Sequence, residues 1–180
     1  MHTQRKVYQN YYGELKSTSL IEFVTPSELL SLFELIAPQF NAQSELLYNN
    51  KEKPYIAFKL SRKHRIIIKS VDSRWSEDMP SDKFLLLAPI CKKGSLTFND
   101  VNKLNRENVD VRFTLYNSKD NRDIYLGLDK LMGLAGGVTV QSIIMTVNEF
   151  IFSQKTLHMA FKHNDNEPFQ ESSPPTVKIH

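Results

Sequence analysis

Hydrophobic positions along the chain change from a helical to an alternating period and back, and each change marks a predicted element. The first period is helical, and between positions 25 and 40 it consists of Leu29, Phe33, Ile36 and Phe40. Thr25 occupies the N-cap position, Pro26 follows at the first helical position, and Glu28 completes a capping box. The sequence therefore predicts a helix that begins at Pro26.

Alternation with a period of two replaces the helical period after this helix. In residues 55–60 and 65–69 the apolar side chains alternate with others on either side of a basic turn, which predicts a hairpin with one buried face. The run FLLLAPI at 84–90 is apolar throughout and predicts an inner strand covered on both faces. Two further alternating runs, at 111–115 and 124–128, flank the polar loop NSKDNR. These runs predict a second hairpin.

Two more helices complete the pattern. Thr97 is the predicted N-cap of a short helix, and Asp100 suits the positive end of the helix dipole. The side chains expected to face inward on this helix are Phe98, Val101 and Leu104. A long helix is predicted from Thr139 to Phe161, with one broad apolar face made of Val140, Ile143, Ile144, Val147, Phe150, Ile151 and Phe161. That face is expected to pack on the sheet.

The order of elements is helix, three strands, helix, two strands, helix, which indicates the α+β class. We predict an antiparallel sheet of about five strands with helices on one face. Residues 21–162 form the predicted domain. Residues 1–20 have no period and are interpreted as a weakly ordered arm, and residues 163–180 are predicted to be a disordered tail.

Composition narrows the class of protein. Of the 180 residues, 41% are hydrophobic, which is enough for a core. The formal charge of +3 is spread over interspersed acids and bases, so nucleic acid is not expected as a partner. The single cysteine, Cys91, suits a reducing compartment. No segment has the apolar run of a signal peptide or a membrane span, so a cytoplasmic location without membrane contact is expected.

Gly136 and Gly137 precede the long helix and raise the question of a phosphate-binding loop. A Walker loop needs a lysine followed by Ser or Thr after its last glycine, but Val138 and Thr139 follow here. A dinucleotide fingerprint needs three spaced glycines after a parallel strand. We interpret the pair as a structural turn in which Thr139 caps the helix. A regulator that binds a small molecule or nucleotide at this glycine elbow stays the alternative.

Catalytic, cofactor-binding and metal-binding residues are not predicted anywhere in the chain. The histidines lack the spacing of a helical zinc site, since His158 and His163 are five residues apart. The acids Asp120, Asp123 and Asp129 do not match a calcium loop, because Lys119 stands where an oxygen ligand is needed. We therefore expect no cofactor and no enzymatic activity.

Two surfaces are candidate partner sites. Met145, Phe152 and Met159 lie seven residues apart, opposite the sheet-facing side of the long helix, where polar residues surround them. The N-terminal arm with its tyrosines could cover this stripe, or a second copy or a client protein could bind it. The second surface is the basic hairpin turn with Arg62, Lys63 and Arg65. This turn is either solvated or a contact for an acidic partner.

The segment from about residue 95 to 162 resembles the C-terminal half of the YbjN family of bacterial proteins. The shared features are Asn102 and Asn105 in a helix, Asp129 in a strand, the Gly137-Val138-Thr139 elbow, and Phe150 in the long helix. The resemblance implies a fold like that of type III secretion chaperones. It also implies a small cytoplasmic protein, grouped with proposed sensory-transduction regulators, for which the family supplies no catalytic residues. A non-enzymatic protein-binding module, homodimeric or holding a partner protein, is the function expected.

Overall fold

The computed structural model describes residues 20–61, 64–92, 96–108, 110–117 and 124–162. The elements follow in the order β1 (Leu20–Ile21), α1 (Pro26–Ile36), the 3-10 helix η1 (Ala37–Phe40), β2 (Gln43–Tyr48), β3 (Pro54–Lys59), β4 (Arg65–Ser70), β5 (Lys83–Lys92), α2 (Phe98–Glu107), β6 (Arg112–Asn117), β7 (Ile124–Gly133), β8 (Val138–Thr139) and α3 (Val140–Lys162). The order confirms the predicted α+β class.

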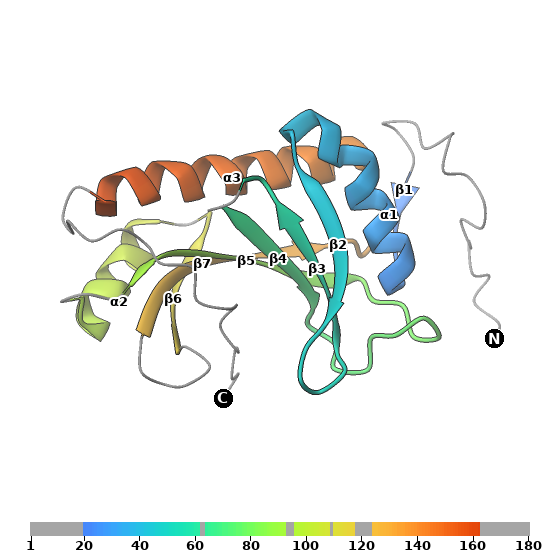
Figure 1. Cartoon of the computed structure of the whole chain (residues 1–180), viewed down its shortest axis with the longest axis horizontal. Helices are drawn as coiled ribbons and strands as arrows, with labels where there is room; N and C mark the ends of the chain where they lie inside the picture. The colour runs from blue at the N-terminus through green and yellow to red at the C-terminus, as the bar shows by residue number, and fades with distance from the viewer. Residues whose placement is uncertain (1–19, 62–63, 93–95, 109, 118–123, 163–180) are drawn as a thin grey trace.

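A six-stranded antiparallel sheet forms the centre of the fold, with the strand order β2-β3-β4-β5-β7-β6. The helices α1 and α3 lie over the same face of this sheet (Figure 1). The short strands β1 and β8 form a separate two-stranded ribbon beside the start of α3. The main sheet thus holds one strand more than the five predicted.

The additional strand is β2, at one edge of the sheet. Its sequence QSELLY places polar residues on both faces, and its side chains are exposed or half-buried along its whole length. An edge strand covered on one side only does not need the clean alternation that identifies a half-buried strand in a sequence. The sequence signal was therefore too weak for a prediction.

Both short helices begin with reciprocal capping boxes. The Glu28 side chain accepts a hydrogen bond from the Thr25 backbone N–H at 2.8 Å, and Thr25 Oγ1 accepts one from the Glu28 N–H at 3.3 Å. Thr97 and Asp100 make the equivalent pair of bonds at 2.7 and 3.3 Å. The predicted N-caps are confirmed, and Asp100 also closes a capping box rather than acting on the dipole alone.

The predicted inward side of α2 is wrong at one position. Val101 is buried and Leu104 half-buried, but Phe98 is 71% exposed. The reason is geometric, because α2 packs mainly against the edge strand β6 and buries one narrow stripe. Phe98 lies about 120° around the helix from Leu104 and falls outside that stripe.

The core lies between the sheet and the two helices on its inner face. The ring of Phe58 on β3 meets the rings of Phe33 and Phe40 edge-on, with centroids 5.3 and 5.8 Å apart. Val147 and Phe150 of α3 are fully buried against the sheet. The predicted sheet-facing side of α3 is confirmed for all its members whose side chains the structure describes; Phe161 lies outside them.

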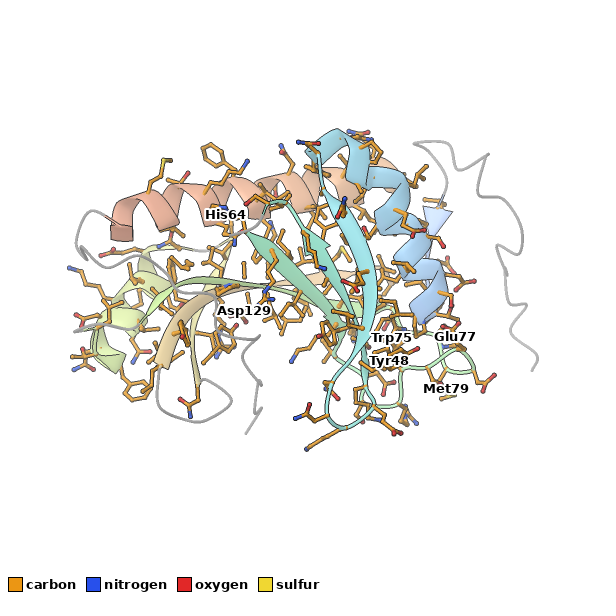
Figure 2. All side chains as sticks on the ribbon, in the orientation of Figure 1. Tyr48, His64, Trp75, Glu77, Met79 and Asp129 are labelled. Carbon is orange, nitrogen blue, oxygen red and sulfur yellow. The ribbon has the colours of Figure 1, made fainter. Side chains whose placement is uncertain are left out.

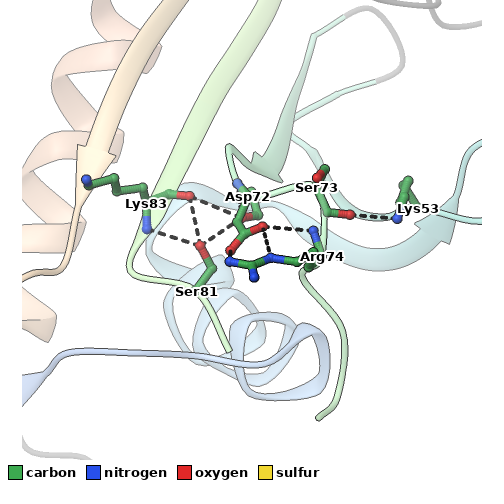
Figure 3. A network of polar contacts seen from close by, with 7 residues as sticks. Lys53, Asp72, Ser73, Arg74, Ser81 and Lys83 are labelled. Carbon is green, nitrogen blue, oxygen red and sulfur yellow. Dashed lines mark hydrogen bonds and ion pairs between the residues drawn. The ribbon is translucent and has the colours of Figure 1, made fainter. Parts of the chain in front are cut away.

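The loop between β4 and β5 ties the N-terminal part of the domain to the sheet. Trp75 is buried, its indole N–H donates to the Val24 carbonyl at 2.9 Å, and its ring meets Phe84 edge-on. Glu77 accepts hydrogen bonds from the backbone and hydroxyl of Ser27 in the first turn of α1. At the base of the loop, polar contacts join Lys53, Asp72, Ser73, Arg74, Ser81 and Lys83 (Figure 3).

Asn105 of α2 shields the free edge of β6. Its side-chain amide donates to the Phe113 carbonyl at 3.0 Å and accepts from the Phe113 N–H at 2.6 Å. The opposite side of β6 is paired with β7. The amide of Asn105 thus occupies the backbone groups of Phe113 as a neighbouring strand would.

Candidate functional site

The solvent side of α3 carries the apolar stripe that the sequence predicts. Met145, Phe152 and Met159 are 55%, 71% and 61% exposed, respectively, while Ile143, Val147 and Phe150 on the opposite side are buried. The exposed polar residues around the stripe are Gln141, Asn148, Glu149, Lys155 and Thr156. No residue in the described part of the chain covers the stripe enough to bury it. Residues 1–19, which could cover it, lie outside that part.

The rest of α3 is fixed to the sheet by polar contacts as well as by apolar packing. Lys130 on β7 forms an ion pair with Glu149 at 2.9 Å. Gln154 is 1% exposed, and its amide N–H donates to the Pro89 carbonyl at 3.4 Å. The helix is therefore a fixed support that holds the stripe on its outer side.

The glycine elbow, Gly136 and Gly137, forms the turn that leads into β8 and α3. Gly136 and Gly137 have φ values of 82° and 85°, a region that side chains with a Cβ rarely adopt. The Leu20 side chain of β1 packs over Gly137, at 3.5 Å from where a Cβ would stand. Thr139 Oγ1 accepts a hydrogen bond from the Ser142 N–H at 3.1 Å, which is an N-cap bond. These dihedral angles and the Thr139 bond agree with the turn interpretation, and ligand binding at the elbow stays a prediction.

The basic hairpin turn is described only in part. Arg62 and Lys63 lie outside the described residues. Arg65 is the first residue of β4, where it pairs with Lys59 of β3 and is half-buried. The structure therefore places Arg65 on the sheet rather than at the tip of the turn.

A polar cluster that the sequence analysis did not predict lies on the sheet face turned away from α1 and α3, which we call the outer face. Asp129 on β7 accepts a hydrogen bond from the Thr114 hydroxyl and pairs in register with Arg112 on β6. Figure 2 shows Asp129 on this side of the sheet. The signal in the sequence was a charged residue at the end of two predicted alternating runs, Lys69 after Ile68 and Asp129 after Leu128.

Partial burial perturbs the charged groups of this cluster. Burial raises the pKa of the Asp129 carboxyl, against the effects of the Thr114 hydrogen bond and of the Arg112 and Lys69 charges. Burial likewise lowers the pKa of Lys69, although the negative charge of Asp129 opposes this shift. Burial is also the main cause of a raised pKa for the Tyr116 hydroxyl, and Asp129 adds to it. The described residues around Asp129 and Lys69 therefore offset only part of the cost of burying these two charges.

The architecture defines an α+β protein in which a helix pair covers one face of an antiparallel sheet. No family model and no curated protein matches the sequence. The fold is similar to the crystal structure of YbjN from E. coli, a proposed transcription regulator, with a TM-score of 0.58 at 14% identity. That similarity covers 81% of this chain and 96% of YbjN. The resemblance seen in the sequence is thus confirmed at the level of the fold.

A second solved structure has a more distant similarity. It is the Yersinia pestis type III secretion chaperone SycH in complex with a stable fragment of YscM2, with a TM-score of 0.43 and 12% identity. The match covers 71% of this chain and 98% of SycH. Among the helices that the structure describes, none combines the length and the apolar run required to cross a membrane.

Proposed function

We propose that this protein is a non-enzymatic binding module that acts through the apolar stripe of α3, either by homodimerisation or by holding a partner protein. The observation that supports the proposal is the stripe itself, three large apolar side chains at seven-residue spacing on a helix that is anchored on its other side. Seven-residue spacing suits the packing of one helix against another. Methionine suits a binding surface because its flexible side chain adapts to its neighbour.

The size of the stripe decides how much affinity it can supply. Full burial of a Met or Phe side chain contributes roughly 1.5–3 kcal/mol, so burying the exposed part of each contributes about 1–2 kcal/mol. A symmetric dimer buries the stripe twice and gains about 6–12 kcal/mol before the cost of association. That cost is about 4–15 kcal/mol, so the stripe supports a weak or moderate dimer, with flanking contacts adding to it.

The test replaces Met145 and Met159 with Lys in the full chain. The change removes four of the six apolar contributions from a dimer, about 4–8 kcal/mol, and is expected to abolish assembly at micromolar concentration. Light scattering measures the mass, and thermal unfolding checks the fold. The matched control replaces Gln141 and Asn148, two exposed polar neighbours on the same helix, with Lys.

The outcome separates the alternatives. Loss of the dimer in the Met145→Lys, Met159→Lys variant alone, with an unchanged melting temperature, supports a dimer seam. If the wild-type chain is monomeric, the same pair of variants is compared for capture of a partner protein from the native cell. An unchanged mass and unchanged capture would refute the proposal, and a large drop in melting temperature would assign the stripe to the core.

A further inference from the structure

The outer face of the sheet is a second surface, and the described helices do not cover it. Ile67 on β4, Leu87 on β5, Asp129 on β7 and Arg112 on β6 follow one another in register across this face. The helices α1 and α3 pack on the opposite face, and α2 packs against the edge strand β6. Leu131 shows the consequence, because it lies on the inner strand β7 and is still 60% exposed.

Apolar side chains on the outer face form a cluster distinct from the main core. Leu87 and Tyr116 are buried, but they do not belong to the core cluster that the sheet shares with α1 and α3. The neighbouring side chains of Tyr55, Ile67 and Leu85 are only half-buried. Half-buried apolar side chains at neighbouring positions of an uncovered sheet face make that face a candidate binding surface.

The charges of the outer face select the chemistry of that occupant. Among the residues whose side chains the structure describes, five cations and two anions share the face, a net charge of +3, and they are Lys59, Arg65, Lys69, Lys83, Arg112, Glu45 and Asp129. Lys59 forms an ion pair with Glu45 at 2.5 Å. The ammonium of Lys69 is half-buried, and Asp129 is the only charged group that the described residues place near enough to raise its pKa. An acidic segment would therefore complement this face, whereas a second copy of the same face would be repelled.

We propose that the outer face binds the acidic part of the chain's own C-terminal segment, residues 165–171. This stretch reads DNEPFQE, and its acids Asp165, Glu167 and Glu171 alternate with uncharged residues. In an extended chain, side chains two residues apart point to the same side. The three carboxylates and the ring of Phe169 then lie on one side, which matches a basic face with apolar side chains between its charges.

Local sequence and chain length both favour this occupant. Pro168 restricts its own backbone and biases Glu167 toward an extended conformation, which lowers the entropy lost on docking. Asp165 and Glu171 follow the end of α3 at Lys162 by three and nine residues, respectively, so they reach about 10–30 Å from it. The last turn of α3 lies toward the end of the molecule that holds α2 (Figure 1). The tethered segment also competes well with a free peptide, because its effective concentration is high.

The first experiment measures how well the segment is protected in the full chain. A glutamate-specific protease cleaves after Glu171, and the rate reports the undocked population. We expect cleavage to be about tenfold faster in a Lys69→Glu, Arg112→Glu variant than in the wild type at low salt. The matched control carries the same charge change at Lys51 and Lys103, which are exposed and lie off the outer face. The Met145→Lys, Met159→Lys variant should cleave at the wild-type rate, which separates this proposal from the function proposed for α3.

The second experiment identifies the partner of the contact. A carbodiimide forms amide bonds between touching carboxylates and lysines, so we expect links from residues 165–171 to Lys69. In an equal mixture of unlabelled and ¹⁵N-labelled protein, these links should join peptides of one label only. A charge-swapped chain, with Asp165, Glu167 and Glu171 changed to Lys in the Lys69→Glu, Arg112→Glu background, should restore links to position 69 and add links to position 112.

Three results would contradict the docking of residues 165–171 on the outer face. Equal cleavage rates in the wild type, the Lys69→Glu, Arg112→Glu variant and the control would show that the outer face does not hold the segment. Links between peptides that carry different labels would show that the outer face binds the segment of a second copy rather than that of its own chain. Links to Lys69 that persist unchanged in an Arg112→Glu variant, which keeps the lysine, would show that the outer-face charges do not direct the contact.

Discussion

Gly127 on β7 is a position where one added methyl group should have a large and calculable effect. The ring of Tyr116 lies directly over this glycine, and a Cβ at position 127 would overlap the ring edge, with Cδ2 at 2.8 Å. The same Cβ would lie 3.0 Å from the carbonyl oxygen of Ala88, so the backbone behind it leaves no space either. A Gly127→Ala variant therefore has to move the Tyr116 ring.

The magnitude follows from what the ring loses. Tyr116 is 6% exposed, so displacement returns most of its apolar surface to water, at a cost of about 1.5–3 kcal/mol. The cost of overpacking a core by one methyl group is similar, about 1–3 kcal/mol. For a chain of this size, 1 kcal/mol lowers the melting temperature by about 2–4 °C, so we expect a decrease of about 3–12 °C.

Urea denaturation and thermal unfolding provide the measurement, and the same strand provides the control. Gly133 also lies on β7, but a Cβ there would meet no atom within 4 Å, so Gly133→Ala should leave stability unchanged or slightly raised. In a Tyr116→Ala background, Gly127→Ala should cost less than in the wild type, because the obstructing ring is gone and only the close contact with the Ala88 carbonyl remains. An equal cost in both backgrounds, or no cost in the wild type, would refute the steric reasoning.

Two further substitutions test the elbow and the outer face. Gly137→Val places a β-branched residue at a φ of 85° and should lower the free energy of unfolding by at least about 1 kcal/mol, so an unchanged melting temperature would contradict the assigned strain. Asp129→Asn removes a carboxyl whose pKa is raised by burial. Below the ordinary carboxyl pKa this group is protonated in both the folded and the unfolded state, so its ionisation destabilises the folded state only at higher pH. The variant should be more stable than the wild type near pH 7, and denaturation across pH should show the gain shrinking to zero by about pH 3–4; a gain that instead grows toward acid would have the wrong sign.

Sequence reasoning succeeded where one local interaction determines the structure. Thr25 and Glu28 signal a helix start because the capping box is complete within four residues. The stripe of Met145, Phe152 and Met159 was visible because helical geometry alone fixes which side chains oppose the sheet.

The sequence-based predictions failed where packing between distant elements, and not the local sequence, determines the structure. Phe98 has the spacing of a core residue, but α2 packs mainly on an edge strand and leaves this ring exposed. The cluster around Asp129 joins residues from three strands, β4, β6 and β7, whose order in the sheet no local pattern specifies. Strand order is set by long-range pairing, so the neighbours of Asp129 could be identified only from the structure.

The amide of Asn105 against the edge of β6 has a consequence for how copies of this chain could assemble. A sheet with two free edges can add a strand at each end, and repeated addition in one direction gives an open filament. When Asn105 occupies the backbone of Phe113, a strand added at that edge loses the two hydrogen bonds of Phe113. Edge-to-edge growth is then favoured on the β2 side, where two copies related by a two-fold axis use up that edge. One side-chain amide thus favours closed assemblies over fibres.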